Sequence, residues 1–261
     1  MTHDRLEREI ALLDEGRGCL DLTGFRAVAV GGADAGAWLQ DLVTADVLSH
    51  GPGPAVRSLL LGPTGRIRAD LHVLRQPDGF LLLQALDQPV AVNDLLAPYV
   101  LSSQVALRVL PTPDLVAIPG IGGWDFRPAG AERLEPVSVT ALETWRIRRG
   151  IARFPVDLDE DSLPAEAALD DGVVIDRAKG CFLGQESAAK VRNLGHPARV
   201  ILGLRAGGPV HAGDAVLAEG SDAGVLTSVE APGGPGAVIA RVRWAARDAE
   251  LRAGQGVPLS R

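Results

Sequence analysis

The stretch Lys179-Gly180-Cys181-Phe182-Leu183-Gly184-Gln185-Glu186 gathers an amine, a thiol and two glycines within eight residues. Glycine adopts backbone conformations that a Cβ blocks, so Gly180 and Gly184 predict a tight loop that presents Cys181. Good helix formers follow, so a helix is expected from about Gln185. A thiolate close to a lysine and just before a helix is stabilised by the local positive field. We therefore expect Cys181 to be a reactive, partly exposed thiol.

A second interpretation of Cys181 is a buried cysteine that serves as a small hydrophobic side chain. The flanking glycines favour the functional interpretation. The chain has one other cysteine, Cys19, which lies in an apolar segment and is expected in the core. Alkylation of the folded protein distinguishes the two interpretations, because only an exposed thiol reacts.

Composition narrows the class of protein. The chain has 261 residues, 46% of them hydrophobic and 23% charged, with a net charge of −7. These values are typical of a soluble globular protein, and the acidic balance argues against broad nucleic-acid binding. The sequence has no long apolar run that predicts a membrane span and no N-terminal signal-peptide pattern, so a cytoplasmic protein is expected. The spacing of Cys and His does not match a metal site.

The first two thirds of the chain predict strands interleaved with helices. Residues 27–30 predict a buried strand, and Asp34 is a good N-cap for a helix that carries Trp38 and Leu39 on its apolar face. Residues 66–73 alternate apolar and polar side chains, which predicts a half-buried strand with one solvated face. Residues 80–83 are its expected antiparallel partner. This pattern indicates an α+β fold, with helices packed on largely antiparallel sheets.

A further helix and a barrel are expected towards the C-terminus. Residues 139–149 predict a helix with Val139, Leu142 and Trp145 along one stripe, ended by Gly150. After residue 198 the chain has short apolar segments separated by Gly/Pro turns, at 200–204, 215–217, 224–228 and 237–242. Regularly spaced short strands of this kind predict a small β-barrel.

The octapeptide resembles the signature K-G-C-[FY]-x-G-Q-E of the YgfZ family, and every position of the signature is filled. That family is similar to the T-protein of the glycine cleavage system, the aminomethyltransferase. The segment from Val30 to Val47 and the Gly224-x-x-Thr227-Ser228 pattern also resemble both families. The resemblance implies a T-protein-like folate-binding fold with three parts. These are an α+β folate-binding region at 1–110, a second α+β region with the motif at 111–198, and the barrel at 199–261.

The resemblance also implies site residues. Cys181 is the expected functional thiol, and Lys179, Gly180, Phe182, Gly184, Gln185 and Glu186 shape its loop. Asp70 falls where T-proteins carry an aspartate that contacts the reactive part of folate. From spacing alone, Asp70 is equally well a solvated carboxylate beside Arg68, where an exposed ion pair contributes little.

A cluster of arginines at 146–153 is the most basic stretch of the chain. Guanidinium groups bind carboxylates bidentately, so Arg146 and Arg148 are candidates to hold the glutamate tail of a folate. Arginines in the last turn also complement the helix dipole, and both interpretations stay open. Arg148 occupies the position where T-proteins have a glutamate that helps to hold the pterin. This departure weakens an aminomethyltransferase interpretation.

The sequence leaves three functions open. The first is a folate-binding protein that takes tetrahydrofolate or a one-carbon derivative and supports 4Fe–4S assembly or repair in client enzymes, as the resemblance implies. Two cysteines cannot supply the four thiolates that commonly hold such a cluster, so the role is that of a helper to client or assembly proteins. The second is a tetrahydrofolate-dependent aminomethyltransferase, which would make the chain an enzyme. The third is a tRNA-binding module, which the acidic charge opposes.

Overall fold

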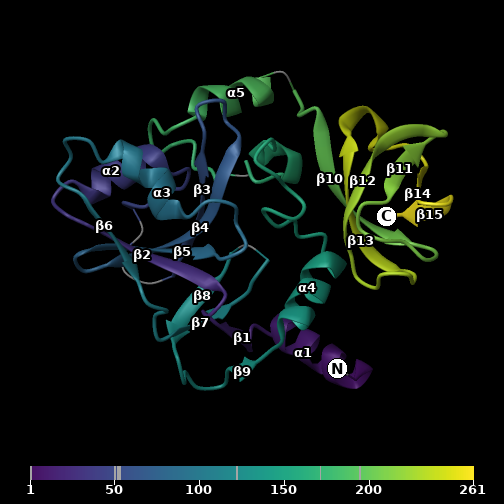
Figure 1. Cartoon of the computed structure of the whole chain (residues 1–261), viewed down its shortest axis with the longest axis horizontal. Coiled ribbons are helices and arrows are strands. Elements are labelled where there is room, and N and C mark those ends of the chain that lie inside the picture. The colour runs from purple at the N-terminus through teal and green to yellow at the C-terminus, as the bar shows by residue number, and fades with distance from the viewer. Residues whose placement is uncertain (1, 50, 52–53, 122, 171, 194) are drawn as a thin grey trace.

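The structure is a computed structural model that describes residues 2–49, 51, 54–121, 123–170, 172–193 and 195–261. Two sheets and their helices form the body of the molecule, and a separate barrel lies beside it at the C-terminal end (Figure 1). The predicted fold class, α+β followed by a small C-terminal barrel, is confirmed.

The larger sheet has five strands in the order β3-β4-β5-β2-β6, and all neighbours are antiparallel. Its strands are β2 (Phe25–Gly31), β3 (Val56–Leu61), β4 (Ile67–Gln76), β5 (Gly79–Ala85) and β6 (Ala106–Leu110). The expected pairing of residues 66–73 with 80–83 is the β4–β5 hairpin, in which Val73 lies opposite Leu82.

Helices cover one face of this sheet. They are α2 (Ala35–Leu42), α3 (Val92–Leu96) and the 3-10 turn η1 (Ala97–Tyr99). Leu39 from α2 and Leu71 and Leu82 from the strands are fully buried between the two layers. Asp34 precedes α2 as expected, but its carboxylate does not cap the helix; it accepts a hydrogen bond from the backbone N–H of Gln104 at 2.7 Å.

A second, smaller sheet covers the opposite face. Its strand order is β8-β7-β1-β9, formed by β1 (Gly18–Asp21), β7 (Leu115–Ile118), β8 (Asp125–Pro128) and β9 (Glu135–Pro136). Leu74, Leu83 and Phe126 pack between the sheets. The expectation of a solvated face on β4 was therefore wrong for His72, which is buried, because the second sheet closes over it.

The N-terminal helix packs on the helix predicted at 139–149. These are α1 (His3–Asp14) and α4 (Val139–Arg148), with Leu13 and Trp145 in their shared core. Gly150 ends α4 with a φ of +66°, as expected. Val139 was wrongly placed on the apolar stripe, since its side chain is exposed. Because β1 pairs with β7 and β9, one sheet spans the expected boundary at residue 110.

The motif helix is α5 (Gln185–Asn193), which begins at the predicted residue. The barrel is closed in the order β10-β13-β12-β11-β14-β15. The remaining elements are η2 (Pro164–Ala167), β10 (Arg199–Ala206), β11 (Ala215–Ala218), β12 (Ser221–Val229), β13 (Gly236–Arg243), η3 (Trp244–Ala246), β14 (Leu251–Ala253) and β15 (Val257–Ser260). No helix in the described ranges has the length and apolar composition needed to cross a membrane.

Candidate functional site

The loop of the Lys179–Glu186 motif lies against the turn that joins β3 to β4. Gly180 and Gly184 adopt φ values of +103° and +80°, which side chains disfavour. A Cβ at Gly184 would come within 2.4 Å of the carbonyl oxygen of Gly62, so only glycine allows this close approach. The two glycines therefore shape the loop as the sequence predicts, and Gly184 also packs it onto the larger sheet.

The loop turns one side chain inward and one outward. Phe182 is buried with Leu61 and Phe154, whereas Cys181 is exposed and carries a free thiol. Cys19 is buried, and burial raises the pKa of its thiol. The expected exposure of Cys181 and burial of Cys19 are confirmed, and the reactivity of Cys181 stays a prediction.

The rest of the motif shapes the start of the helix. Gln185 is half-buried and begins α5, and Glu186 lies exposed in the first turn of that helix. A carboxylate in the first turn interacts favourably with the helix dipole. The Glu186 side chain thus fits a role in stabilising the helix that follows the thiol.

Lys179 fastens the loop to the end of α2. Its ammonium group donates hydrogen bonds to the backbone carbonyls of Val43 and Ala45, the latter at 2.9 Å. A cation beside carbonyls at a helix C-terminus is stabilised by the helix dipole. Burial lowers the pKa of Lys179 to about 8, although nearby aspartates act in the opposite direction. Lys179 is thus an anchor for the segment that presents Cys181.

Replacing Lys179 with methionine is expected to lower the free energy of unfolding by about 1–3 kcal/mol, because two buried carbonyls lose a charged donor. Urea unfolding measures the change. Lys190→Met, at an exposed position of α5, is the matched control and should change stability by less than about 0.5 kcal/mol. Equal effects of the two substitutions would contradict the anchoring role.

A cavity of about 100 Å³ lies between the larger sheet and the segment from α4 to residue 154. Aromatic side chains line it together with polar side chains from β3, β4, α4 and the connecting segments. The described residues that line it include Phe25, Arg57, Asp70, His72, Gln88, Trp124, Trp145, Arg146 and Phe154. Aromatic rings beside polar groups suit a flat ring system with a polar edge. The volume is below the 300–1,000 Å³ or so typical of whole-ligand pockets, so the enclosed part is too small for a complete drug-sized molecule.

Asp70 lines this cavity, but its neighbour differs from the one expected. Arg57 donates to its carboxylate from two of the guanidinium nitrogens, with Nη2–Oδ2 at 2.6 Å and Nε–Oδ1 at 3.1 Å. The interpretation of Asp70 as a solvated partner of Arg68 was wrong, because Arg68 pairs with Glu160. A carboxylate oxygen has two lone pairs, so Asp70 still has acceptor capacity for a ligand.

The backbone of Asp70 is held by a side chain that the sequence did not single out. Gln88 donates to the Asp70 carbonyl at 2.8 Å and accepts from the Asp70 N–H at 3.0 Å. The pairing of β5 with β4 starts at Leu71. At Asp70 the Gln88 amide therefore makes the two backbone hydrogen bonds that a neighbouring strand would otherwise make. An isolated glutamine after a strand carries no motif that could have predicted this role.

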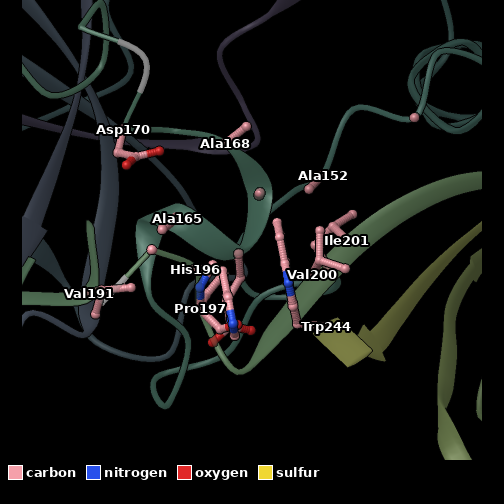
Figure 2. Close-up of a pocket in the computed structure, with 14 residues that line it drawn as sticks. Ala152, Ala165, Ala168, Asp170, Val191, His196, Pro197, Val200, Ile201 and Trp244 are labelled. Atoms are coloured by element: carbon pink, nitrogen blue, oxygen red, sulfur yellow. The ribbon is translucent and has the colours of Figure 1, made fainter. Parts of the chain in front are cut away.

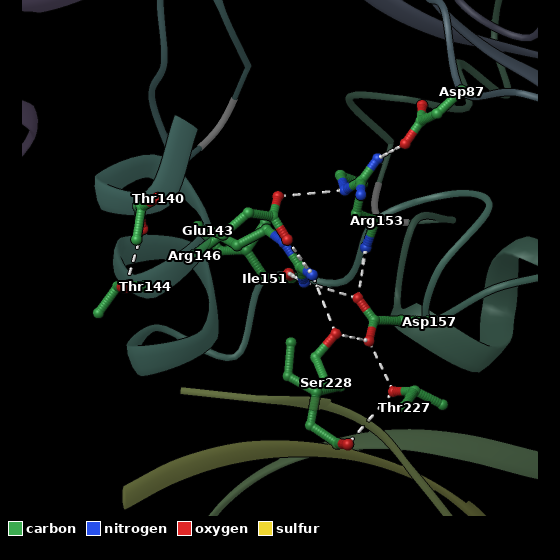
Figure 3. Close-up of polar contacts among 11 residues, drawn as sticks. Asp87, Thr140, Glu143, Thr144, Arg146, Ile151, Arg153, Asp157, Thr227 and Ser228 are labelled. Atoms are coloured by element: carbon green, nitrogen blue, oxygen red, sulfur yellow. Dashed lines mark hydrogen bonds and ion pairs between the residues drawn. The ribbon is translucent and has the colours of Figure 1, made fainter. Parts of the chain in front are cut away.

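Arg146 also lines the cavity, yet its guanidinium is bound inside the protein (Figure 3). It donates to Asp157 at 2.7 Å, to Glu143 at 2.7 Å and to the hydroxyl of Ser228 at 2.9 Å. Asp157 also accepts from Ser228 and from Thr227 at 2.6 Å, and both of these belong to β12 of the barrel. Arg146 therefore ties α4 to the barrel, and its role towards a folate stays a prediction.

The other arginines of the 146–153 stretch also face carboxylates. Arg148 binds Glu7 and Glu230, each at 2.7 Å, Arg149 pairs with Asp14, and Arg153 pairs with Asp87. The partners Glu7 and Glu230 raise the pKa of Arg148, so it stays charged. Paired arginines are poorly placed to bind phosphates, which removes the support that this stretch gave to a tRNA-binding module.

The structure brings together only some of the predicted site residues. Asp70 and Arg146 line one cavity, whereas Cys181 and Arg148 are not among the described residues that line it. Phe182, next to the thiol, contacts the same apolar cluster as Phe154 in the cavity wall. In the described part of the chain, no three His, Cys, Asp or Glu side chains form a group that could hold a metal ion.

A larger hollow of about 490 Å³ lies where the barrel meets η2 and the end of α5 (Figure 2). His196 stacks on Trp244 in its wall with ring centroids 4.8 Å apart. The carboxylate of Glu166 also lies in the wall and is bound by Arg241. None of the predicted site residues is among the described residues that line this hollow.

Similar proteins agree with this architecture. Residues 2–97 match the family model of the GCVT N-terminal domain. The chain is 25% identical over 209 residues to the mitochondrial iron–sulfur cluster assembly factor IBA57 homologue of Pyricularia oryzae, in an alignment that covers 67% of this chain and 54% of that protein. It is 27% identical over 266 residues to an aminomethyltransferase of Rubrobacter xylanophilus, covering 81% and 71% of the two chains.

A solved structure extends the similarity to the whole fold. The glycine cleavage system aminomethyltransferase T of Bartonella henselae matches 97% of this chain and 87% of its own with a TM-score of 0.79 and 20% identity. The chain spans about half the length of the assembly factor that it matches. The chain therefore has the fold of aminomethyltransferase T, and its residues 2–97 match the GCVT N-terminal domain.

Proposed function

We propose that this chain is a folate-binding protein of the YgfZ type that supports the assembly or repair of 4Fe–4S clusters in client enzymes. The observation that carries the proposal is the exposed thiol of Cys181 on a loop that Lys179, Phe182 and Gly184 hold in place. A fixed thiol open to solvent suits contact with a partner protein or a cluster intermediate. The similarity to an iron–sulfur cluster assembly factor supports this role.

The proposal includes a tetrahydrofolate or one-carbon derivative whose ring end enters the cavity beside Asp70. The support is the resemblance to the T-protein, the aromatic lining and the acceptor capacity of the Asp70 carboxylate. The partners are iron–sulfur client or assembly proteins, which the resemblance extends to tRNA-modifying enzymes. The thiol and the cavity are separate surfaces, so we assign ligand binding to one and partner contact to the other.

Substitution of Cys181 tests the proposal. Deleting the gene is expected to lower the activity of a 4Fe–4S enzyme, and the wild-type protein, but not Cys181→Ala, should restore it. Cys19→Ala is the matched control, since that thiol is buried, and it should restore activity. Alkylation of the folded protein should modify Cys181 and leave Cys19 intact, which checks accessibility independently of the genetics.

Each outcome has a separate meaning. Rescue by Cys181→Ala would remove the thiol from the proposal and leave the helper role. An unchanged 4Fe–4S enzyme in the deletion strain, with redundancy controlled, would overturn the helper role itself. Alkylation of Cys19 in place of Cys181 would contradict the exposure on which the proposal depends.

The second candidate is a tetrahydrofolate-dependent aminomethyltransferase, and Asp70 in the cavity wall favours it. Arg148 at the position of the T-protein glutamate opposes it, since its guanidinium is bound by Glu7 and Glu230. A glycine-cleavage assay with lipoyl carrier protein distinguishes the two candidates. Robust formation of methylenetetrahydrofolate would place the enzyme first.

A further inference from the structure

His72 is a buried polar side chain in the wall of the cavity, at a position where the sequence predicts a solvated face. Only 9% of the residue is exposed. Its ring lies against Trp124 and Phe126, with centroid distances of 5.5 and 5.2 Å. Its Nε2 atom is buried and has no hydrogen-bond partner among the described residues.

An unpaired buried nitrogen requires an explanation, because the great majority of buried polar groups in proteins are hydrogen-bonded. Leu74, two residues further along β4, packs in the apolar core between the sheets. A leucine or phenylalanine at position 72 would fill the same layer without leaving a polar atom unsatisfied. The histidine therefore weakens the ligand-free protein at this point, as is typical of a binding residue whose partner is a ligand.

The charge of the ring narrows the ligand class. Burial lowers the pKa of His72 to about 4, so the imidazole is neutral near pH 7. A neutral imidazole offers one N–H donor and one acceptor nitrogen, and does not attract anions. Asp70 lines the same cavity two residues away and supplies an acceptor. These groups together complement the polar edge of a neutral heterocycle held between aromatic walls.

We propose that the imidazole of His72 forms a hydrogen bond with the polar ring edge of a flat heteroaromatic ligand in this cavity, and so helps to decide which ring system the protein accepts. The inference rests on the proposed function, because a folate is the ring-bearing ligand considered. His72 binds and positions the ring and takes no part in transferring a group. This role depends on the histidine and not on the fold, because an apolar residue at position 72 would pack equally well between the two sheets.

Titration of the full-length protein with tetrahydrofolate by calorimetry, under reducing conditions, tests the proposal. His72→Phe keeps an aromatic ring and removes the hydrogen bond, and we expect the affinity to fall about tenfold, equivalent to about 1.4 kcal/mol. His72→Gln carries a polar atom to a similar position and should stay within about threefold of wild type. His211→Phe, on an exposed barrel loop, is the control and should bind as wild type does.

Thermal unfolding of the ligand-free variants supplies a second measurement. His72→Phe should raise the unfolding midpoint, because it removes an unsatisfied buried group and the cavity has room for the ring. If the role of His72 were purely structural, its replacement would lower the unfolding midpoint. If His72→Phe does not fold, His72→Leu serves the same comparison.

The outcomes separate the inference from the proposed function. Equal affinity of wild type and His72→Phe, or an equal loss in His72→Phe and His72→Gln, overturns the hydrogen bond and leaves folate binding intact. A lower unfolding midpoint for both apolar variants also overturns it. Failure of the wild-type protein to bind tetrahydrofolate overturns folate binding, and the inference fails with it.

Discussion

Replacing Asp157 with alanine is expected to lower the free energy of unfolding by about 3–5 kcal/mol, because removing one partner of a buried ion pair leaves an uncompensated charge. Asp157 is 1% exposed and Arg146 is 4% exposed. The carboxylate accepts from Arg146 at 2.7 Å, from the Arg153 N–H at 3.0 Å and from two hydroxyls of the barrel strand β12. Alanine removes all four acceptor contacts at once (Figure 3).

Two further substitutions show which interactions account for the loss of unfolding free energy. Asp157→Asn keeps an oxygen that accepts from Arg146. Its N–H₂ group can donate to the hydroxyls of Thr227 and Ser228, which rotate to accept. This variant therefore separates the loss of charge from the loss of hydrogen bonds. Glu160→Ala removes the exposed ion pair with Arg68 and should cost less than about 1 kcal/mol. Urea unfolding followed by tryptophan fluorescence measures all three variants.

The position of Asp157 adds a second expected result. It lies between α4 and the barrel, so its loss should uncouple the two parts as well as weaken them. Trp145 reports on the body and Trp244 on the junction with the barrel. Separate unfolding transitions are expected for Asp157→Ala where the wild type shows one. An effect no larger than that of Glu160→Ala would contradict the view that this network joins body and barrel.

Local patterns in the sequence predict part of this fold. The alternation at residues 66–73 indicates β4, and the glycines of the motif indicate the loop that exposes Cys181. The apolar segments after residue 198 indicate four of the barrel strands. The helix α1 and the strands β1, β3, β6 to β9, β14 and β15 were not predicted. In the last two strands, Gly and Pro interrupt the stretch at 251–260, which lacks a continuous apolar run.

The long-range packing could not be predicted in the same way. A period of two shows which side chains of β4 share a face, but not whether another sheet covers that face. The covering strands come from residues 18–21 and 115–128, which precede and follow the strands of the larger sheet along the chain. The cavity depends on this packing, so Asp70 was identified only through a family resemblance, and His72, Arg57 and Gln88 were not identified as site residues.

Acidification is expected to destabilise the wild-type protein more than His72→Phe, by about 3 kcal/mol in total between pH 7 and pH 4. Burial lowers the pKa of His72 to about 4, whereas an unfolded histidine has a pKa of about 6.5. Between these two values the unfolded chain binds a proton that the folded chain excludes, so stability falls as the pH falls. Above about pH 6.5 both states are neutral, and below about pH 4 both are protonated, so the difference is constant outside this window.

The difference in unfolding free energy between wild type and His72→Phe separates the titration of His72 from that of the other groups. The nearby Asp70 carboxylate favours protonation of the ring and Arg57 opposes it, and both are kept in the variant. Urea unfolding at pH 7.0, 5.5 and 4.5 gives the two curves, and NMR titration of the five histidines gives the pKa of His72 directly. Parallel curves, or a pKa near 6.5, would mean that water reaches the ring. Burial would then no longer explain why the imidazole is neutral at pH 7, as binding of a heterocycle requires. Divergent curves would show that His72 lowers the stability of the folded, ligand-free protein.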